Sequence, residues 1–141
     1  ATAGYDDLER WRRAVKWTTD TVEVRDDVAL AGAKTGQILF RWHLGTRHPV
    51  EVSGQDGKWQ VSWPDATMAI ESATALEVTQ EQLPDHTLEE RTWEETGKDW
   101  LHACVIVRTT TPVTSAGIVT RVVARSPATN AESTPKTGSN P

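Results

Sequence analysis

Runs in which apolar and polar side chains alternate are the feature of this sequence that most restricts its fold. In the run 22–28, valines alternate with charged residues, which is the period of a strand with one solvent-exposed face. In the run 38–44, large apolar residues share one face, while Arg41 and His43 lie on the other. We expect the second run to be a central strand over a core, beside the first, with Arg41 and His43 directed at a groove or partner surface.

Similar runs follow along the whole chain and are separated by turn signals. The dipeptide Asp56-Gly57 favours a type I′ hairpin turn, which needs a left-handed backbone at both central positions. The run 100–108 is almost continuously apolar, so it is expected at the centre of a sheet. About ten strands without a convincing long helix predict an all-β fold, an antiparallel β-sandwich. The expected strands cover residues 12–18, 22–28, 38–44, 49–53, 58–63, 68–70, 76–78, 87–93, 100–108 and 118–123.

The length of the chain predicts one domain and a tail. Residues 1–125 are enough to bury a core without disulfide bonds, and the only cysteine, Cys104, reads as a small core residue. Residues 126–141 contain no large apolar side chain, which predicts a disordered tail or linker. The chain opens on Ala1 without an initiator methionine or a signal-type segment, so we expect a processed chain or a fragment.

Composition and charge narrow the classes of partner. The formal net charge is -5, and the basic residues are scattered apart from Arg10, Arg12 and Arg13, so nucleic-acid binding is not expected. Alternation divides that small cluster between two faces of a strand. No apolar run approaches the roughly 20 residues of a membrane-spanning helix, so no membrane association is expected. The 7 tryptophans against one tyrosine and one phenylalanine suit either a sandwich core or a sugar-stacking surface.

Arg41, Trp42 and His43 are the candidate substrate-binding residues. A guanidinium can hold a carboxylate with two hydrogen bonds, and an indole can stack on a pyranose ring, as binding of a carboxylated sugar requires. The alternative interpretation is that Trp42 belongs to the core and Arg41 pairs with an acidic residue across the sheet.

Metal binding and catalysis find less support. His43 and His48, with Asp26 or Asp27 on a neighbouring strand, would supply the ligand types of a zinc site, but their spacing matches no compact ligand motif. We therefore predict no metal and no cofactor. Motifs for acyl transfer, nucleotide hydrolysis and zinc proteolysis are absent, and no base and partner can be assigned to one cleft. No catalytic residue is named.

Four segments occur in a fixed order in the first third of the chain: Tyr5, then 11–15 with its Arg-Arg pair, then 22–27 with its Asp-Asp pair, then 40–45. This order resembles the C-terminal β-region of heparinase II/III-like proteins. Those proteins run from a tyrosine through an arginine-rich strand into a Val-Val-Asp-Asp type strand and then a Phe-His-Leu type strand.

The resemblance implies a polysaccharide lyase, in which a helical toroid precedes a large antiparallel β-sandwich. Such enzymes cleave uronic-acid polysaccharides, including glycosaminoglycans, by β-elimination. The family's His-x-His-x-Asp and His-Asn-Thr segments have no counterpart here, and Tyr5 and His43 match framework positions only, so no catalytic or zinc-binding residue is carried over.

The chain is therefore expected to be the C-terminal part of such a lyase, inactive alone, with packing and substrate-lining roles. Its implied partners are an acidic polysaccharide and the toroid and remaining sandwich of the same protein, in a secreted or periplasmic location. One alternative is a free-standing carbohydrate-binding β-sandwich, and another is a purely structural interaction module.

Overall fold

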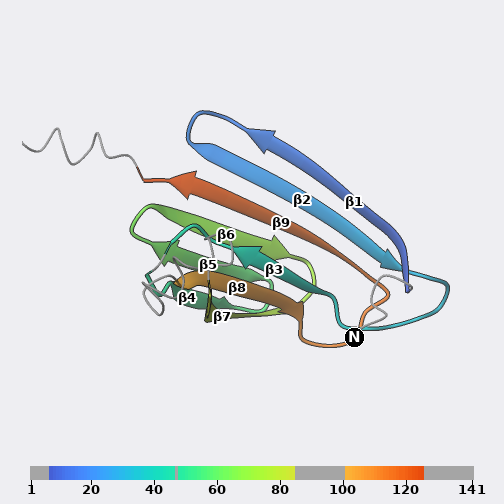
Figure 1. The fold of residues 1–141 in the computed structure, drawn as a ribbon. Helices are drawn as coiled ribbons and strands as arrows, with labels where there is room; N and C mark the ends of the chain where they lie inside the picture. The colour runs from blue at the N-terminus through green and yellow to red at the C-terminus, as the bar shows by residue number, and fades with distance from the viewer. Residues whose placement is uncertain (1–6, 47, 85–100, 126–141) are drawn as a thin grey trace, which may run out of the picture.

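The computed structural model describes residues 7–46, 48–84 and 101–125, and these form two antiparallel β-sheets (Figure 1). The larger sheet has the strand order β1-β2-β9-β6-β5-β4, and the smaller has the order β3-β8-β7. This arrangement confirms the predicted all-β, antiparallel sandwich. The strands are β1 (Leu8–Trp17), β2 (Thr21–Leu30), β3 (Leu39–His43), β4 (Glu51–Gln55), β5 (Lys58–Trp63), β6 (Ala66–Ser72), β7 (Leu76–Pro84), β8 (Leu101–Thr109) and β9 (Ser115–Ala124).

Two of the sequence-based expectations fall outside the described residues. These are the strand expected at 87–93 and the tail expected at 126–141. Within the described residues there are nine strands and no helix. This part of the chain therefore contains no helix that could cross a membrane.

The two runs that dominate the sequence do not lie side by side. The first forms β2, an inner strand of the larger sheet between β1 and β9. The second forms β3, which pairs with β8 alone among the described strands and so is an edge strand of the smaller sheet. The expectation of a central strand at this run was wrong. The central strand is β8, whose segment 103–107 is buried throughout, as its continuous apolar run predicted.

A short turn joins β1 and β2 into a hairpin. The backbone N–H of Thr18 donates to the carbonyl of Thr21 at 2.8 Å. The carboxylate of Asp20 accepts hydrogen bonds from the hydroxyls of Thr18 and Thr21, each at 3.2 Å. These local bonds satisfy polar groups where the chain reverses direction.

The expected hairpin turn between β4 and β5 differs in its backbone. Asp56 has a left-handed φ of 53°, but Gly57 does not share it, so the expectation of a type I′ turn was wrong. Gly57 is needed for another reason. A β-carbon there would lie 2.0 Å from the carbonyl oxygen of Ser72, while the Ser72 N–H donates to the Gly57 carbonyl at 2.8 Å. The glycine therefore permits a close approach between this turn and the end of β6.

The core lies between the facing sides of the two sheets. Met68 and Ile70 of β6 and Val61 of β5 project from the larger sheet, and Val105 and Val107 project from the smaller one. Each is almost fully buried, and burial of an aliphatic side chain of this size contributes about 1.5–3 kcal/mol. Cys104 is buried and free, as the sequence indicated.

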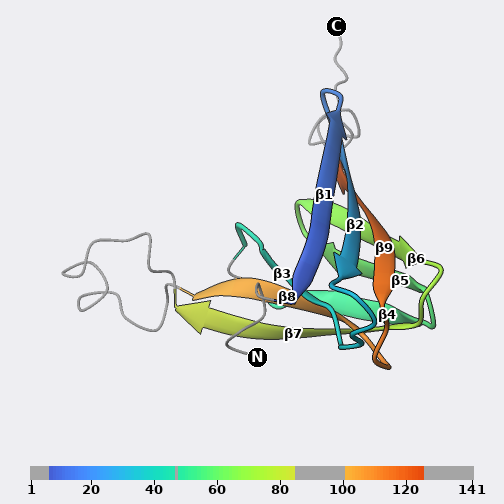
Figure 2. The ribbon, with the colours of Figure 1, turned by 90° about the vertical axis from the view of Figure 1, so that its right-hand side faces the viewer.

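The smaller sheet covers only part of the larger one. Figure 2 shows β3, β8 and β7 crossing the larger sheet at a steep angle, while the hairpin end of β1 and β2 rises away from them. At the opposite end of β1 and β2, the two sheets approach each other around β3. Because the cover is incomplete, a groove forms between β1, β2 and β3, and the outer edge of β1 stays open among the described strands.

Candidate binding groove

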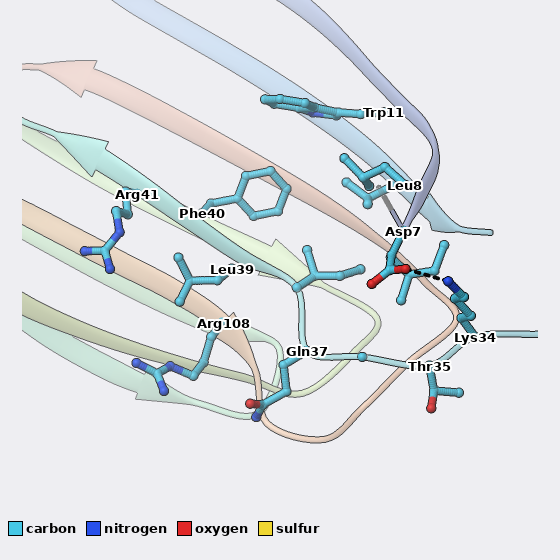
Figure 3. Close-up of a pocket in the computed structure, with 14 residues that line it drawn as sticks. Asp7, Leu8, Trp11, Lys34, Thr35, Gln37, Leu39, Phe40, Arg41 and Arg108 are labelled. Carbon is cyan, nitrogen blue, oxygen red and sulfur yellow. Dashed lines mark hydrogen bonds and ion pairs between the residues drawn. The ribbon is translucent and has the colours of Figure 1, made fainter. Parts of the chain in front are cut away.

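A groove of about 930 Å³ opens where β1, β2 and β3 come together (Figure 3). It runs along the edge strand β3, so side chains from both faces of that strand line it: Phe40 from the inner face, and Leu39 and Arg41 from the outer face. The link between β2 and β3 supplies a further part of the wall. The groove therefore depends on β3 being at an edge, because an additional strand beside β3 would fill it.

One wall of the groove is apolar and contains two aromatic rings. Trp11 of β1 and Phe40 of β3 meet edge to face, with ring centroids 6.2 Å apart and planes at 65°. Behind them, Val28 and Ile38 belong to a small buried cluster that also contacts Leu8. Trp11 nevertheless stays 46% exposed, so part of its ring is open to a ligand.

Three cationic side chains line the same groove. Lys34 lies in the link after β2, Arg41 on β3, and Arg108 near the end of β8. Among the described lining residues, the one carboxylate is Asp7. The described lining residues thus carry more positive than negative charge, in a chain whose formal net charge is -5.

Each of these cations has an acidic neighbour at the surface. The Lys34 Nζ atom lies 2.6 Å from the Asp7 carboxylate, Arg41 Nη1 lies 3.2 Å from Glu81, and Arg108 Nε lies 3.7 Å from Glu77. The Arg108 Nε atom is buried and has no hydrogen-bond partner among the described residues. Exposed ion pairs of this kind contribute about 0–1 kcal/mol, so a ligand carboxylate can replace the protein carboxylate at little cost.

A buried carboxylate fixes the orientation of the aromatic wall. The side chain of Asp26, which is 1% exposed, accepts hydrogen bonds from Arg13 Nε at 2.7 Å, Arg13 Nη2 at 3.0 Å and Trp11 Nε1 at 2.9 Å. The Arg13 guanidinium lies 5.2 Å from the ring centroids of both Trp11 and Trp42. Strands β1, β2 and β3 are thus joined by one polar and aromatic cluster, and Trp11 is held in place before any ligand arrives.

The three residues selected from the sequence do not form one surface. Arg41 lines the groove and pairs with Glu81 of β7 across the smaller sheet. Trp42 points to the opposite side of β3 and packs partly buried against the core. His43 is on the outer side, with its Nδ1 atom 2.8 Å from Nε2 of His102. The core position of Trp42 and the ion pair of Arg41 match the alternative interpretation, and substrate binding by these residues stays a prediction.

The residues considered for zinc are separated in the same way. His43 faces His102, whereas Asp26 is bonded to Arg13 and Trp11 on the larger sheet. His48 lines a different, shallower hollow beside Trp63. In the part of the chain that is described, no group of three His, Cys, Asp or Glu side chains is placed to hold a metal ion.

Of the three cations that line the groove, only Arg41 was predicted from the sequence as a binding residue. Lys34 lies between glycines in a link, and Arg108 follows an apolar run, so neither had a recognisable motif. Asp26 did leave a signal, because it occupies an apolar position in the alternation of β2. A carboxylate at such a position requires a buried partner, and the Arg-Arg pair in β1 supplies one.

Comparisons with known proteins add no further constraint. No protein-family model matches the chain, and no curated protein matches it.

Proposed function

We propose that the groove binds an acidic polysaccharide, and that this sandwich is the non-catalytic C-terminal part of a polysaccharide lyase similar to heparinase II/III proteins. The observation that carries the proposal is the placement of Lys34, Arg41 and Arg108 beside a wall that contains Trp11 and Phe40. Uronic acids combine a carboxylate with an apolar ring face, and this groove offers a complement to both. The order of segments in the first third of the chain supports the assignment to a lyase.

The side chains of the groove complement the chemical groups of a uronic acid. Arg41 and Arg108 can each donate two hydrogen bonds to one carboxylate, a geometry that a lysine ammonium does not provide. The half-exposed ring of Trp11 supplies a flat surface for a pyranose face. A groove of about 930 Å³ is at the upper end of the usual size for binding sites, which suits more than one sugar unit.

Among the described lining residues, the groove has no unpaired base of the kind that β-elimination requires. That reaction needs a base to remove the proton next to the carboxylate and a cation or donor to stabilise the negative charge that results. The described lining contains cations but no histidine, tyrosine or cysteine, and its carboxylate, Asp7, is paired with Lys34. These residues can hold a uronate, and the carboxylate that could deprotonate it is already paired.

The second candidate function is a free-standing carbohydrate-binding module. It is favoured by one observation, namely that the described residues supply both the aromatic rings and the cations of the groove. The two candidates differ in selectivity, because a module that depends on stacking on Trp11 would bind neutral glycans as tightly as acidic ones.

Calorimetry with a uronic-acid oligosaccharide tests the binding groove. Replacing Arg41 and Arg108 together with glutamine should weaken binding about ten-fold or more, since two charge-assisted contacts are lost. Arg25→Gln is the control for an arginine removed elsewhere, because Arg25 is exposed on β2 and does not line the groove. Equal affinity of the double variant and the unchanged protein would contradict the proposal.

Turnover is a separate measurement. The chain is mixed with a uronic-acid polymer, and the absorbance of the unsaturated product is followed. We expect no product, and turnover by this chain would contradict the assignment of a non-catalytic part.

A further inference from the structure

The hairpin end of β1 and β2 carries an uncovered apolar patch. Val15 and Trp17 of β1 and Val22 of β2 are 45%, 74% and 39% exposed. The register pairs Trp17 with Val22 and Val15 with the buried Val24, so the patch continues the core-facing side of the larger sheet. In Figure 2 the smaller sheet ends before it reaches the hairpin end of β1 and β2, and the register places these residues at that end.

The same strand has an open edge. β1 is the outermost strand of the larger sheet and, within the described residues, pairs with β2 alone. Its register with β2 is regular from Arg10 to Trp17, with one irregularity between Leu8 and Arg10. Alternate N–H and C=O groups along this length face away from β2 and can accept a further strand.

The other face of β1 is basic. Arg10, Arg12 and Lys16 project from it, and none of the three has a hydrogen-bond or ion-pair partner in the described part of the chain. On the β2 side, Arg12 is opposite Asp27, and Lys16 is opposite Glu23. Glu23 is already bonded to Arg25 and Arg121, so Lys16 is left without a partner.

These features disfavour a second copy of β1 as the occupant. Antiparallel pairing about a two-fold axis would keep the basic faces of both copies on the same side of the joined sheet. Arg10, Arg12 and Lys16 would then lie beside one another, and like charges on neighbouring strands are destabilising. The occupant has to be acidic on that face and apolar on the face that covers Trp17.

We propose that the free edge of β1 binds an extended segment of a partner protein, in which acidic and apolar residues alternate. The segment pairs with the β1 backbone as an added strand. Its acidic side chains contact Arg10, Arg12 and Lys16, and its apolar side chains cover Val15 and Trp17. This surface shares strand β1 with the groove but uses its outer edge and its basic face, so the proposal does not rest on binding of a polysaccharide.

The probe for this proposal is the peptide acetyl-Glu-Val-Glu-Val-Glu-Val-Glu-amide, with a peptide of the same composition in a non-alternating order as comparison. Binding is measured by calorimetry, and amide hydrogen exchange locates it. The alternating peptide should bind about ten-fold more tightly than its comparison and should protect amides of β1. Equal affinity of the two peptides, or protection confined to the edge of β3, would overturn the proposal.

Two variants examine the charge and the patch separately. Arg12→Gln with Lys16→Gln should reduce affinity for the peptide and flatten its dependence on salt, and Trp17→Ser should reduce affinity without changing that dependence. Arg125→Gln is the control for a positive charge removed elsewhere, since Arg125 follows β9 and lines the hollow beside Trp63. The side chains of Arg12, Lys16 and Trp17 are exposed, so these substitutions do not put folding at risk. Unchanged peptide affinity in both variants, or sedimentation as a dimer through β1, would overturn the proposal.

Discussion

A carboxylate at a core position is the most informative single residue of this protein. Asp26 lies on the buried side of β2, where it accepts three hydrogen bonds from Arg13 and Trp11. A buried charge is tolerated only when its hydrogen-bonding capacity is met, and here one guanidinium and one indole meet it. The cluster holds the aromatic wall of the groove in place.

Arg13→Gln should lower the free energy of unfolding by about 3 kcal/mol, because it leaves the Asp26 carboxylate buried without its counter-ion. Arg12→Gln is the matched control, since its neighbour is the exposed Asp27, and this change should stay within about 0.5 kcal/mol. Urea unfolding of both variants measures the difference. Similar losses in the two would mean that the buried pair contributes no special stability.

The outer face of β2 makes a prediction about pH. Hydrogen bonds from Arg121 and Arg25 lower the pKa of Glu23 below its ordinary value. A carboxylate whose pKa is depressed in the folded state stabilises the fold above the unfolded pKa of about 4.3, and this contribution is lost as the pH falls through the folded value.

Glu23→Gln should therefore lower the urea midpoint at about pH 7 and have a smaller effect at about pH 3, which is below the unfolded pKa, so that protonation of the carboxyl in the unfolded state removes part of the contribution. The control is the same Glu23→Gln substitution in a protein in which Arg25 and Arg121 are both glutamine. The hydrogen bonds that lower the pKa of Glu23 are absent from that protein, so the effect of the substitution should not depend on pH. An effect of Glu23→Gln that is the same at both pH values would contradict this explanation.

At the scale of elements, the sequence predicted which segments are strands, and it predicted the position in a sheet for β8 but not for β3. The period of two located β2 and β3, and the continuous apolar run located β8 at the centre of a sheet. The large apolar face of β3 suggested a central strand, but β3 is at an edge. An edge strand whose inner face covers a core has the same alternation of side chains as a central strand. Whether a strand is at the edge depends on its pairing partners, which for β3 are distant residues such as Val105 and Val107.

The turn after β4 can be tested directly. Gly57→Ala should destabilise the fold by more than about 1 kcal/mol, because the added β-carbon would lie 2.0 Å from the Ser72 carbonyl oxygen. Gly45→Ala is the control, since a β-carbon there meets nothing within 4 Å. Thermal unfolding of both proteins compares them. Equal melting temperatures would show that the turn can move away from Ser72 without cost.

At the scale of the whole molecule, the groove results from the unequal size of the two sheets. The smaller sheet leaves part of the larger one uncovered, and β3 forms the boundary of the covered area. Of the candidate binding residues, the sequence indicated Arg41, whereas Lys34, Arg108 and Trp11 come together only through the packing of β1, β8 and the link after β2. Local patterns describe each strand but not which strands meet.

The central claim is that the cations of this groove recognise carboxylates on a sugar chain. The most direct measurement compares the affinity for a uronic-acid oligosaccharide with that for the same oligosaccharide after reduction of its carboxyl groups to alcohols. The account predicts that reduction weakens binding about ten-fold or more. Equal affinity for the charged and the reduced oligosaccharide would contradict it.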